Sequence, residues 1–161
     1  MKELTQKLKL KFRKKFDYLE KNGFVVRYKL IIEIDENENE KSIFNIIYLN
    51  QKTDRGVKII YSFDDENSAI HFKEPNHFSI TILKELSGGG IEDTINLTNY
   101  FELNKKIQNA YKLASLNYYK GTFDERLELF LDFIYDVFTT DLKDVINGKK
   151  WIEVNNWHPY K

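Results

Sequence analysis

Apolar residues recur at helical spacing along residues 122–151, which is the longest regular pattern in the chain. The stripe consists of Phe123, Leu127, Phe130, Leu131, Ile134, Val137, Phe138, Leu142 and Val145. Thr122 and Glu125 have capping-box spacing, which predicts a helix start because each side chain can accept a hydrogen bond from the other residue's backbone amide. Asn147-Gly148 predicts the end, since glycine adopts the left-handed conformation that closes helices. We therefore expect one long helix here, with the rest of the chain packed against it.

Residues 3–22 predict another amphipathic helix, which Gly23 would end. Its apolar stripe consists of Leu4, Leu8, Phe12, Phe16 and Leu19. Lysine and arginine cover much of the remaining helix surface. Because the stripe is regular, we expect this basic helix to pack on the sheet that follows it.

The hydrophobic pattern changes from helical spacing to alternation over residues 24–85, which are rich in β-branched and aromatic residues. The predicted strands are Phe24–Asp35, Ile43–Leu49, Val57–Phe63 and His77–Lys84, with Ala69–Lys73 as a short further candidate. Polar, charged and glycine residues separate them. Since these turns are too short for parallel crossovers, we expect an antiparallel meander.

The last part of the chain predicts a helical hairpin. Asn99 and Glu102 can cap its first helix, and the short connection at residues 117–121 makes the two helices antiparallel neighbours. Leu129 and Phe133 lie outside the apolar stripe of the long helix, so we expect that helix to be covered on more than one side.

These elements predict an α+β fold, an antiparallel four- to five-stranded meander with an N-terminal helix and a C-terminal helical hairpin packed on one face. We expect a single domain over residues 1–161. Its segments are a basic helix (1–22), the sheet (24–85), a glycine-containing linker (86–98), the helical hairpin (99–147) and an aromatic tail (148–161).

Composition narrows the class of protein. Hydrophobic residues make up 42% of the 161 residues, which is enough for a core without a disulfide or metal. The absence of cysteine excludes a disulfide scaffold, a thiolate zinc site and a cysteine nucleophile. The N-terminus lacks the apolar core of a signal peptide, and no apolar run approaches the ~18 residues of a membrane span. We expect a cytoplasmic protein without membrane contact.

Net charge is zero, but the two signs are unevenly placed. Residues 1–30 contain ten Lys and Arg against three Asp and Glu, which gives 10 − 3 = +7, and the remainder carries 15 − 22 = −7. A basic first helix and an acidic body can pair with each other inside one molecule, or they can form two surfaces for different partners.

Catalytic and metal-binding motifs give little support for an enzyme. Gly88–Gly90 has neither the Lys-Ser/Thr of a phosphate-binding loop nor dinucleotide-binding spacing, and no Gly-x-Ser-x-Gly sequence occurs. A metal site near Asp64 or Glu66 would require the three histidines to come together. Their spacing in the sequence is not that of metal ligands, since they are His71, His77 and His158. We expect no catalytic residues, no cofactor and no metal.

Carboxylates recur at every fourth residue of the long predicted helix, at Asp124, Glu128, Asp132 and Asp136, a set that we call the acidic ridge. The ridge is either a solvated face partly neutralised by the first helix, or a binding surface for a basic protein. For the second alternative the anchor candidates are Tyr135, Tyr118 and Tyr119, because tyrosine adds large contact area with a polar tip.

Three segments resemble small bacterial immunity-type proteins that accompany polymorphic toxins. They are FDYLEKNGF at residues 16–24, the strand Arg27–Ile34, and the end of the long helix at Asn147–Trp151. The resemblance implies a single cytoplasmic α+β domain that neutralises a cognate toxin by binding it. It assigns no functional residues, because such proteins bind through surfaces rather than through a shared site.

Nucleic-acid binding is the alternative function. Phosphates would contact the basic first helix at Lys7, Lys9, Arg13, Lys14 and Lys21, with Tyr28 available for stacking. The compensating acidic body makes this alternative the weaker one. The oligomeric state does not follow from the sequence.

Overall fold

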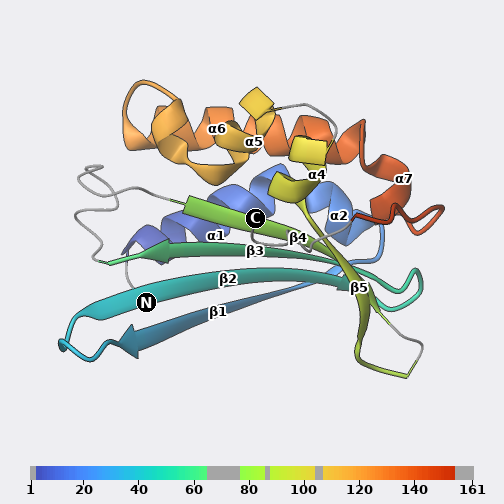
Figure 1. Cartoon of the computed structure of the whole chain (residues 1–161), viewed down its shortest axis with the longest axis horizontal. Coiled ribbons are helices and arrows are strands. Elements are labelled where there is room, and N and C mark those ends of the chain that lie inside the picture. The colour runs from blue at the N-terminus through green and yellow to red at the C-terminus, as the bar shows by residue number, and fades with distance from the viewer. Residues whose placement is uncertain (1–2, 65–76, 86–87, 104–106, 155–161) are drawn as a thin grey trace, which may run out of the picture.

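A computed structural model describes residues 3–64, 77–85, 88–103 and 107–154. The strands form a five-stranded antiparallel meander in the order β1-β2-β3-β4-β5 (Figure 1). Their bounds are β1 Val25–Ile34, β2 Glu40–Asn50, β3 Arg55–Phe63, β4 His77–Glu85 and β5 Ile91–Asn96. The predicted α+β class and the antiparallel meander are therefore confirmed. The candidate strand at residues 69–73 lies outside the described residues.

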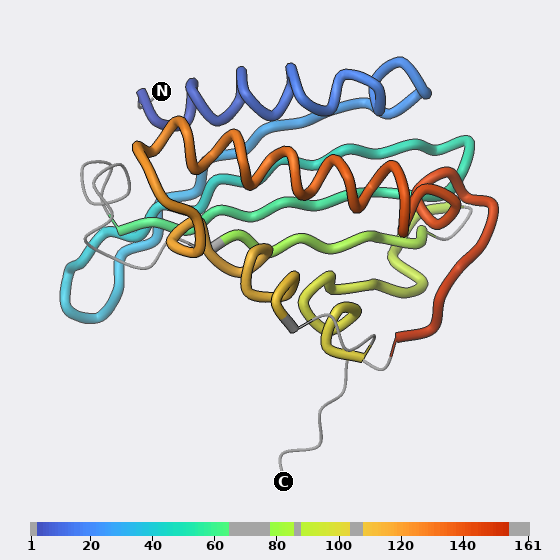
Figure 2. Tube along the Cα trace, turned by 90° about the horizontal axis from the view of Figure 1, so that it is seen from above, coloured from blue at the N-terminus to red at the C-terminus, as the bar shows by residue number. Residues whose placement is uncertain are grey.

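The helices cover one face of this sheet (Figures 1 and 2). Their bounds are α1 Glu3–Lys15, α2 Asp17–Lys21, α4 Leu97–Leu103, α5 Ile107–Ala114, α6 Phe123–Thr139 and α7 Lys143–Ile146, with a 3₁₀ turn, η1, at Leu116–Tyr118. Six described α-helices thus replace the three that the periodicity predicted. Each predicted helix corresponds to two observed ones.

The centre of the core lies where α1 and α6 meet the sheet. Phe78 of β4 contacts both helices, since its ring centroid is 5.8 Å from that of Phe12 in α1 and 4.5 Å from that of Phe130 in α6. Ile134, one turn after Phe130, is also fully buried. The predicted apolar stripes of both helices therefore face the sheet.

The long predicted helix is wrong beyond Thr139. Its capping box forms as expected, with Glu125 accepting from the Thr122 amide at 2.8 Å. At the other end, the Thr139 and Thr140 hydroxyls donate to backbone carbonyls of the preceding turn, and Thr140 leaves helical geometry at φ −118° and ψ −85°. Threonine pairs that bond to the backbone compete with helix continuation. The chain then turns inward as α7, and Gly148 ends it at φ +76°.

The first predicted helix is also interrupted. Phe16 separates α1 from α2 with φ −107° and ψ 24°, while Gly23 ends α2 at φ +94° as expected. The Phe16 side chain is fully buried against Tyr48 and Phe138, at centroid distances of 6.4 and 5.6 Å. Tertiary packing at this residue overrides the local preference for a continuous helix.

The predicted linker at residues 86–98 contains the fifth strand. β5 has Ile95 as its only residue that is buried in the core, so it lacks the alternation that marks a strand in sequence. The next helix begins at Leu97 rather than Asn99. Asn96 is its cap, because the Asn96 side chain accepts from the Thr98 amide at 3.0 Å.

Arg55 fastens the C-terminal segment to the sheet. This buried side chain donates from Nε to the Val145 carbonyl at 3.0 Å and from Nη2 to the Lys150 carbonyl at 3.4 Å. Its guanidinium also lies 5.1 Å from the Trp151 ring, whose Nε1 donates to Asp93 of β5 at 2.7 Å. Arg55 therefore connects β3 both to the last turn of α7 and to the segment that follows it.

Candidate interaction surface

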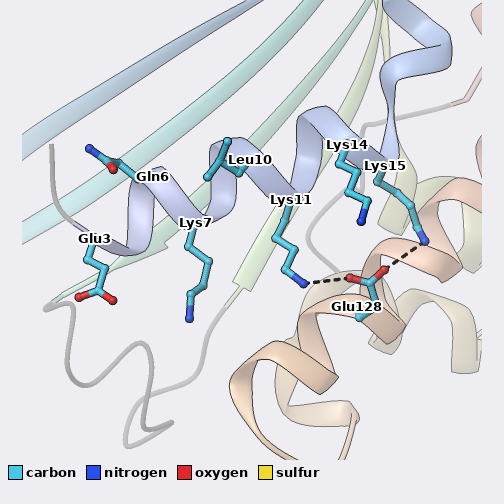
Figure 3. A pocket seen from close by; sticks show the side chains of 8 residues that line it. All are labelled: Glu3, Gln6, Lys7, Leu10, Lys11, Lys14, Lys15 and Glu128. Carbon is cyan, nitrogen blue, oxygen red and sulfur yellow. Dashed lines mark hydrogen bonds and ion pairs between the residues drawn. The ribbon is translucent and has the colours of Figure 1, made fainter.

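Helices α1 and α6 lie side by side and run in the same direction (Figure 2). Lysines of α1 face carboxylates of α6, and both sets recur every fourth residue. The ion pairs are Lys7–Asp124 at 3.3 Å, Lys11–Glu128 at 3.4 Å, Lys15–Glu128 at 3.5 Å and Lys15–Asp132. We call these four pairs the charge ladder. Figure 3 shows Lys11 and Lys15 reaching Glu128 from neighbouring turns of α1.

The charge ladder places three carboxylates of the acidic ridge in internal pairs. Their side chains nevertheless stay about half exposed, at 53% for Asp124, 49% for Glu128 and 56% for Asp132. Exposed pairs of this kind contribute only ~0.2–1 kcal/mol each. The ladder therefore neutralises much of the ridge while leaving its carboxylate oxygens accessible.

Lys15 is the most buried lysine of the ladder, with a side chain that is 22% exposed. Burial alone would lower the pKa of this ammonium group, but the carboxylates of Asp132 and Glu128 outweigh burial and raise the pKa above its ordinary value. The charged form of Lys15 is thus favoured by its surroundings.

A groove of about 640 Å³ follows the ladder, lined by one flank of α1 from Glu3 to Lys15 and by Glu128 (Figure 3). Leu10 lies in this groove and is 70% exposed. The other lining side chains are polar or charged, and Lys7, Lys11 and Lys15 among them already contact α6.

The ridge changes character at its C-terminal end. Tyr135 is 40% exposed and meets the Tyr18 ring edge-on, with the centroids 5.4 Å apart, so it belongs partly to the contact between α6 and α2. Asp136 is exposed, and within the described chain its carboxylate is in no ion pair. It is the ridge carboxylate that the ladder does not neutralise.

The two tyrosines before α6 differ in accessibility. Tyr118 is 47% exposed and meets Tyr119 edge-on at 5.5 Å between centroids. Tyr119 instead packs on Phe130 at 6.4 Å, and burial raises the pKa of its hydroxyl. Of this predicted pair of anchors, the structure leaves Tyr118 at the surface.

Tyr118 belongs to a partly exposed cluster whose other members were not predicted as binding residues. The Lys112 ammonium lies 5.4 Å from the Tyr118 ring centroid and 5.5 Å from that of Phe133. Leu129, one helical turn before Phe133, is 48% exposed. We call Lys112, Tyr118, Leu129 and Phe133 the Tyr118 patch. In the sequence, Leu129 and Phe133 fall outside the apolar stripe, which led us to expect that this helix is covered on more than one side. That second covering is incomplete, because Leu129 is 48% exposed.

Four of the five basic residues proposed for nucleic-acid binding are engaged within the chain, and Lys14 is exposed. Lys7, Arg13 and Lys21 each pair with a carboxylate, at N–O distances of 3.3, 3.2 and 2.7 Å. The Lys9 ammonium lies 5.0 Å from the Tyr28 ring centroid, which places that ring against α1. Phosphate binding here would have to compete with these contacts.

The described residues contain neither a candidate metal site nor a candidate membrane span. No group of His, Asp or Glu in the described ranges could hold a metal ion. Of the residues considered in the sequence, His71, Glu66 and His158 lie outside those ranges, as does the His77 side chain. No described helix has both the length and the apolarity to cross a bilayer.

Comparison of the chain with protein-family models, with curated proteins and with solved structures finds no match. The resemblance to immunity-type proteins therefore stays a prediction.

Proposed function

We propose that this chain is a protein-binding module of the immunity type, which neutralises a cognate toxin by binding it directly through the Tyr118 patch. The observation that carries the proposal is the exposure of Tyr118 and Leu129, at 47% and 48%, on the helical layer. Tyrosine is among the residues enriched at the energetic centres of protein interfaces, and an exposed apolar neighbour adds area that a partner can cover.

The charges around the patch favour a basic partner. Asp132 and Asp136 each lie three residues after a patch member of α6, so they flank Leu129 and Phe133 on the helix surface. Asp136 has no ion pair among the described residues, and Asp132 is 56% exposed despite its contact with Lys15. Carboxylates at the rim speed association with a basic surface and reject acidic partners.

The first test is to co-express this protein with the candidate toxin, which is the product of the gene next to the one that encodes this chain. We expect restored growth and a complex of the two purified proteins. Tyr118→Ala combined with Leu129→Ala should weaken binding by ~30-fold or more, because a single tyrosine anchor contributes about 2 kcal/mol or more. Leu10→Ala is the matched control, since Leu10 is 70% exposed but lies on α1. Equal loss in the control would reject the patch, and absence of any complex would reject the neutralising role.

The rim carboxylates give a kinetic test. Asp132→Lys with Asp136→Lys should slow association and flatten its salt dependence, while dissociation changes less. In parallel, fluorescence anisotropy with mixed DNA and RNA examines the alternative function. Binding that fades steeply as salt rises would support phosphate contacts through α1 and argue against the protein-binding proposal.

A further inference from the structure

Strand β1 is an open edge of the sheet. It pairs with β2 along its full length, from Val25 opposite Leu49 to Ile34 opposite Glu40, without a register shift. Within the described chain no strand lies on its other side, and β1 forms the lower edge in Figure 1. Unpaired amides and carbonyls along such an edge are a template for another strand.

The opposite edge of the sheet is protected. β5 has six residues, a register shift where it meets Glu85, and polar side chains at most positions. Trp151 also bonds to Asp93 of this strand at 2.7 Å. Short, irregular and covered edges are common means of preventing strand addition, and among the described residues β1 has none of these three features. Its edge carries charge instead, at Arg27, Lys29 and Glu33.

The apolar side chains of β1 are unusually exposed. The exposed fraction is 50% for Ile32 and 67% for Ile34. Both lie on the same face of the sheet as Tyr28, which packs on Phe44 beneath the helices. The odd-numbered residues lie on the open face, where Arg27, Lys29 and Glu33 are exposed. One face of the edge is thus apolar and the other carries both signs of charge.

We propose that β1 pairs antiparallel with β1 of a second copy, with the two-fold axis at Leu30, so that the sheet continues across a symmetric dimer. In this register, position i faces position 60 − i of the other copy, and residues 26–34 are paired. Tyr28 then lies opposite Ile32, and Val26 lies opposite Ile34. On the open face, Arg27 of each copy lies opposite Glu33 of the other.

Neighbouring registers are less favourable. An axis at Lys29 places that ammonium opposite its own copy, and like charges directly across a strand pair are destabilising. An axis at Ile31 places Glu33 opposite Lys29 but pairs residues 28–34 rather than 26–34. The register at Leu30 combines the longer pairing with two identical opposite-charge contacts.

The test is sedimentation velocity over a wide concentration range. The wild-type chain should show a concentration-dependent doubling of its 19.3 kDa mass. Arg27→Glu or Glu33→Arg alone places like charges opposite each other twice, which should raise the dimer dissociation constant by roughly ten- to a hundred-fold. The two substitutions in one chain restore opposite charges and should restore the dimer. An equimolar mixture of the two single variants should form the heterodimer.

Three controls separate the register from other effects. Glu36→Arg makes the same charge change in the turn after β1 and should leave association unchanged. Lys29→Glu with Glu33→Arg should stay monomeric, and rescue by this pair would overturn the register at Leu30. A wild-type chain that is monomeric throughout would overturn the dimer. Circular dichroism melting of each variant verifies that it is folded. Because β1 and the Tyr118 patch are on different elements, neither outcome of this experiment decides the toxin-binding proposal, which has its own test.

Discussion

Reversing single charges on α6 distinguishes a structural charge ladder from a purely solvated ridge. Asp132→Lys removes the contact with Lys15 and places a second ammonium beside it. Asp136→Lys makes the same change one turn later, where no ion pair occurs among the described residues. The two variants therefore have the same net charge and the same helix, and differ in whether a ladder contact is lost.

The expected difference follows from the exposure of the groups. Loss of a half-exposed pair costs ~0.2–1 kcal/mol, and the new repulsion with Lys15 adds a similar amount. For a chain of this size, ~1 kcal/mol lowers the melting temperature by about 2–4 °C. Asp136→Lys should be neutral or slightly stabilising, because a cation in the last turn of α6 is favoured by the helix dipole.

The assay is thermal melting by circular dichroism at low and high salt. Asp132→Lys should melt below Asp136→Lys at low salt, with the gap narrowing as salt screens the charges. Equal melting temperatures would refute the inference that the ladder stabilises the packing of α1 on α6. A lower melting temperature for Asp136→Lys would show that this residue has a contact which the geometry does not assign.

The same contact has a defined pH dependence. The folded-state pKa of Lys15 is raised above its ordinary value near 10.5, so its contribution to stability is fully present below that value. It is lost only as the pH rises through the raised pKa. The melting difference between wild type and Asp132→Lys should therefore be constant from neutral to mildly alkaline pH.

Two further predictions concern burial and anchoring. Phe130→Ala should lower the free energy of unfolding by ~3–5 kcal/mol, whereas Leu129→Ala, at a half-exposed neighbour, should change it by less than ~0.5 kcal/mol; urea denaturation measures both, and equal losses would contradict the assigned orientation of α6. Arg55→Lys cannot reproduce the guanidinium contacts with the Val145 and Lys150 carbonyls and should cost ~1–3 kcal/mol, with a weaker near-ultraviolet signal from Trp151; an unchanged signal would argue against the stacked contact.

Local sequence determined the elements whose signals are self-contained. Strands β1 to β4 follow from β-branched and aromatic runs separated by short polar turns, which also impose antiparallel order. The capping box at Thr122 forms as predicted, and Gly23 and Gly148 end α2 and α7 as predicted. Each of these signals depends only on residues within one turn. The burial of Phe130 was likewise predictable from periodicity.

Tertiary structure decided the features that depend on distant residues. Whether α1 continues past Phe16 depends on Tyr48 and Phe138, which bury that ring, and β5 exists because β4 provides its hydrogen-bonding partner. The acidic ridge was visible in sequence, and its neutralisation by α1 was one of two alternatives. The parallel placement of α1 beside α6 brings the four-residue repeats of lysine and carboxylate into register. No local signal in the sequence could set this register, because partners such as Lys7 and Asp124 are 117 residues apart.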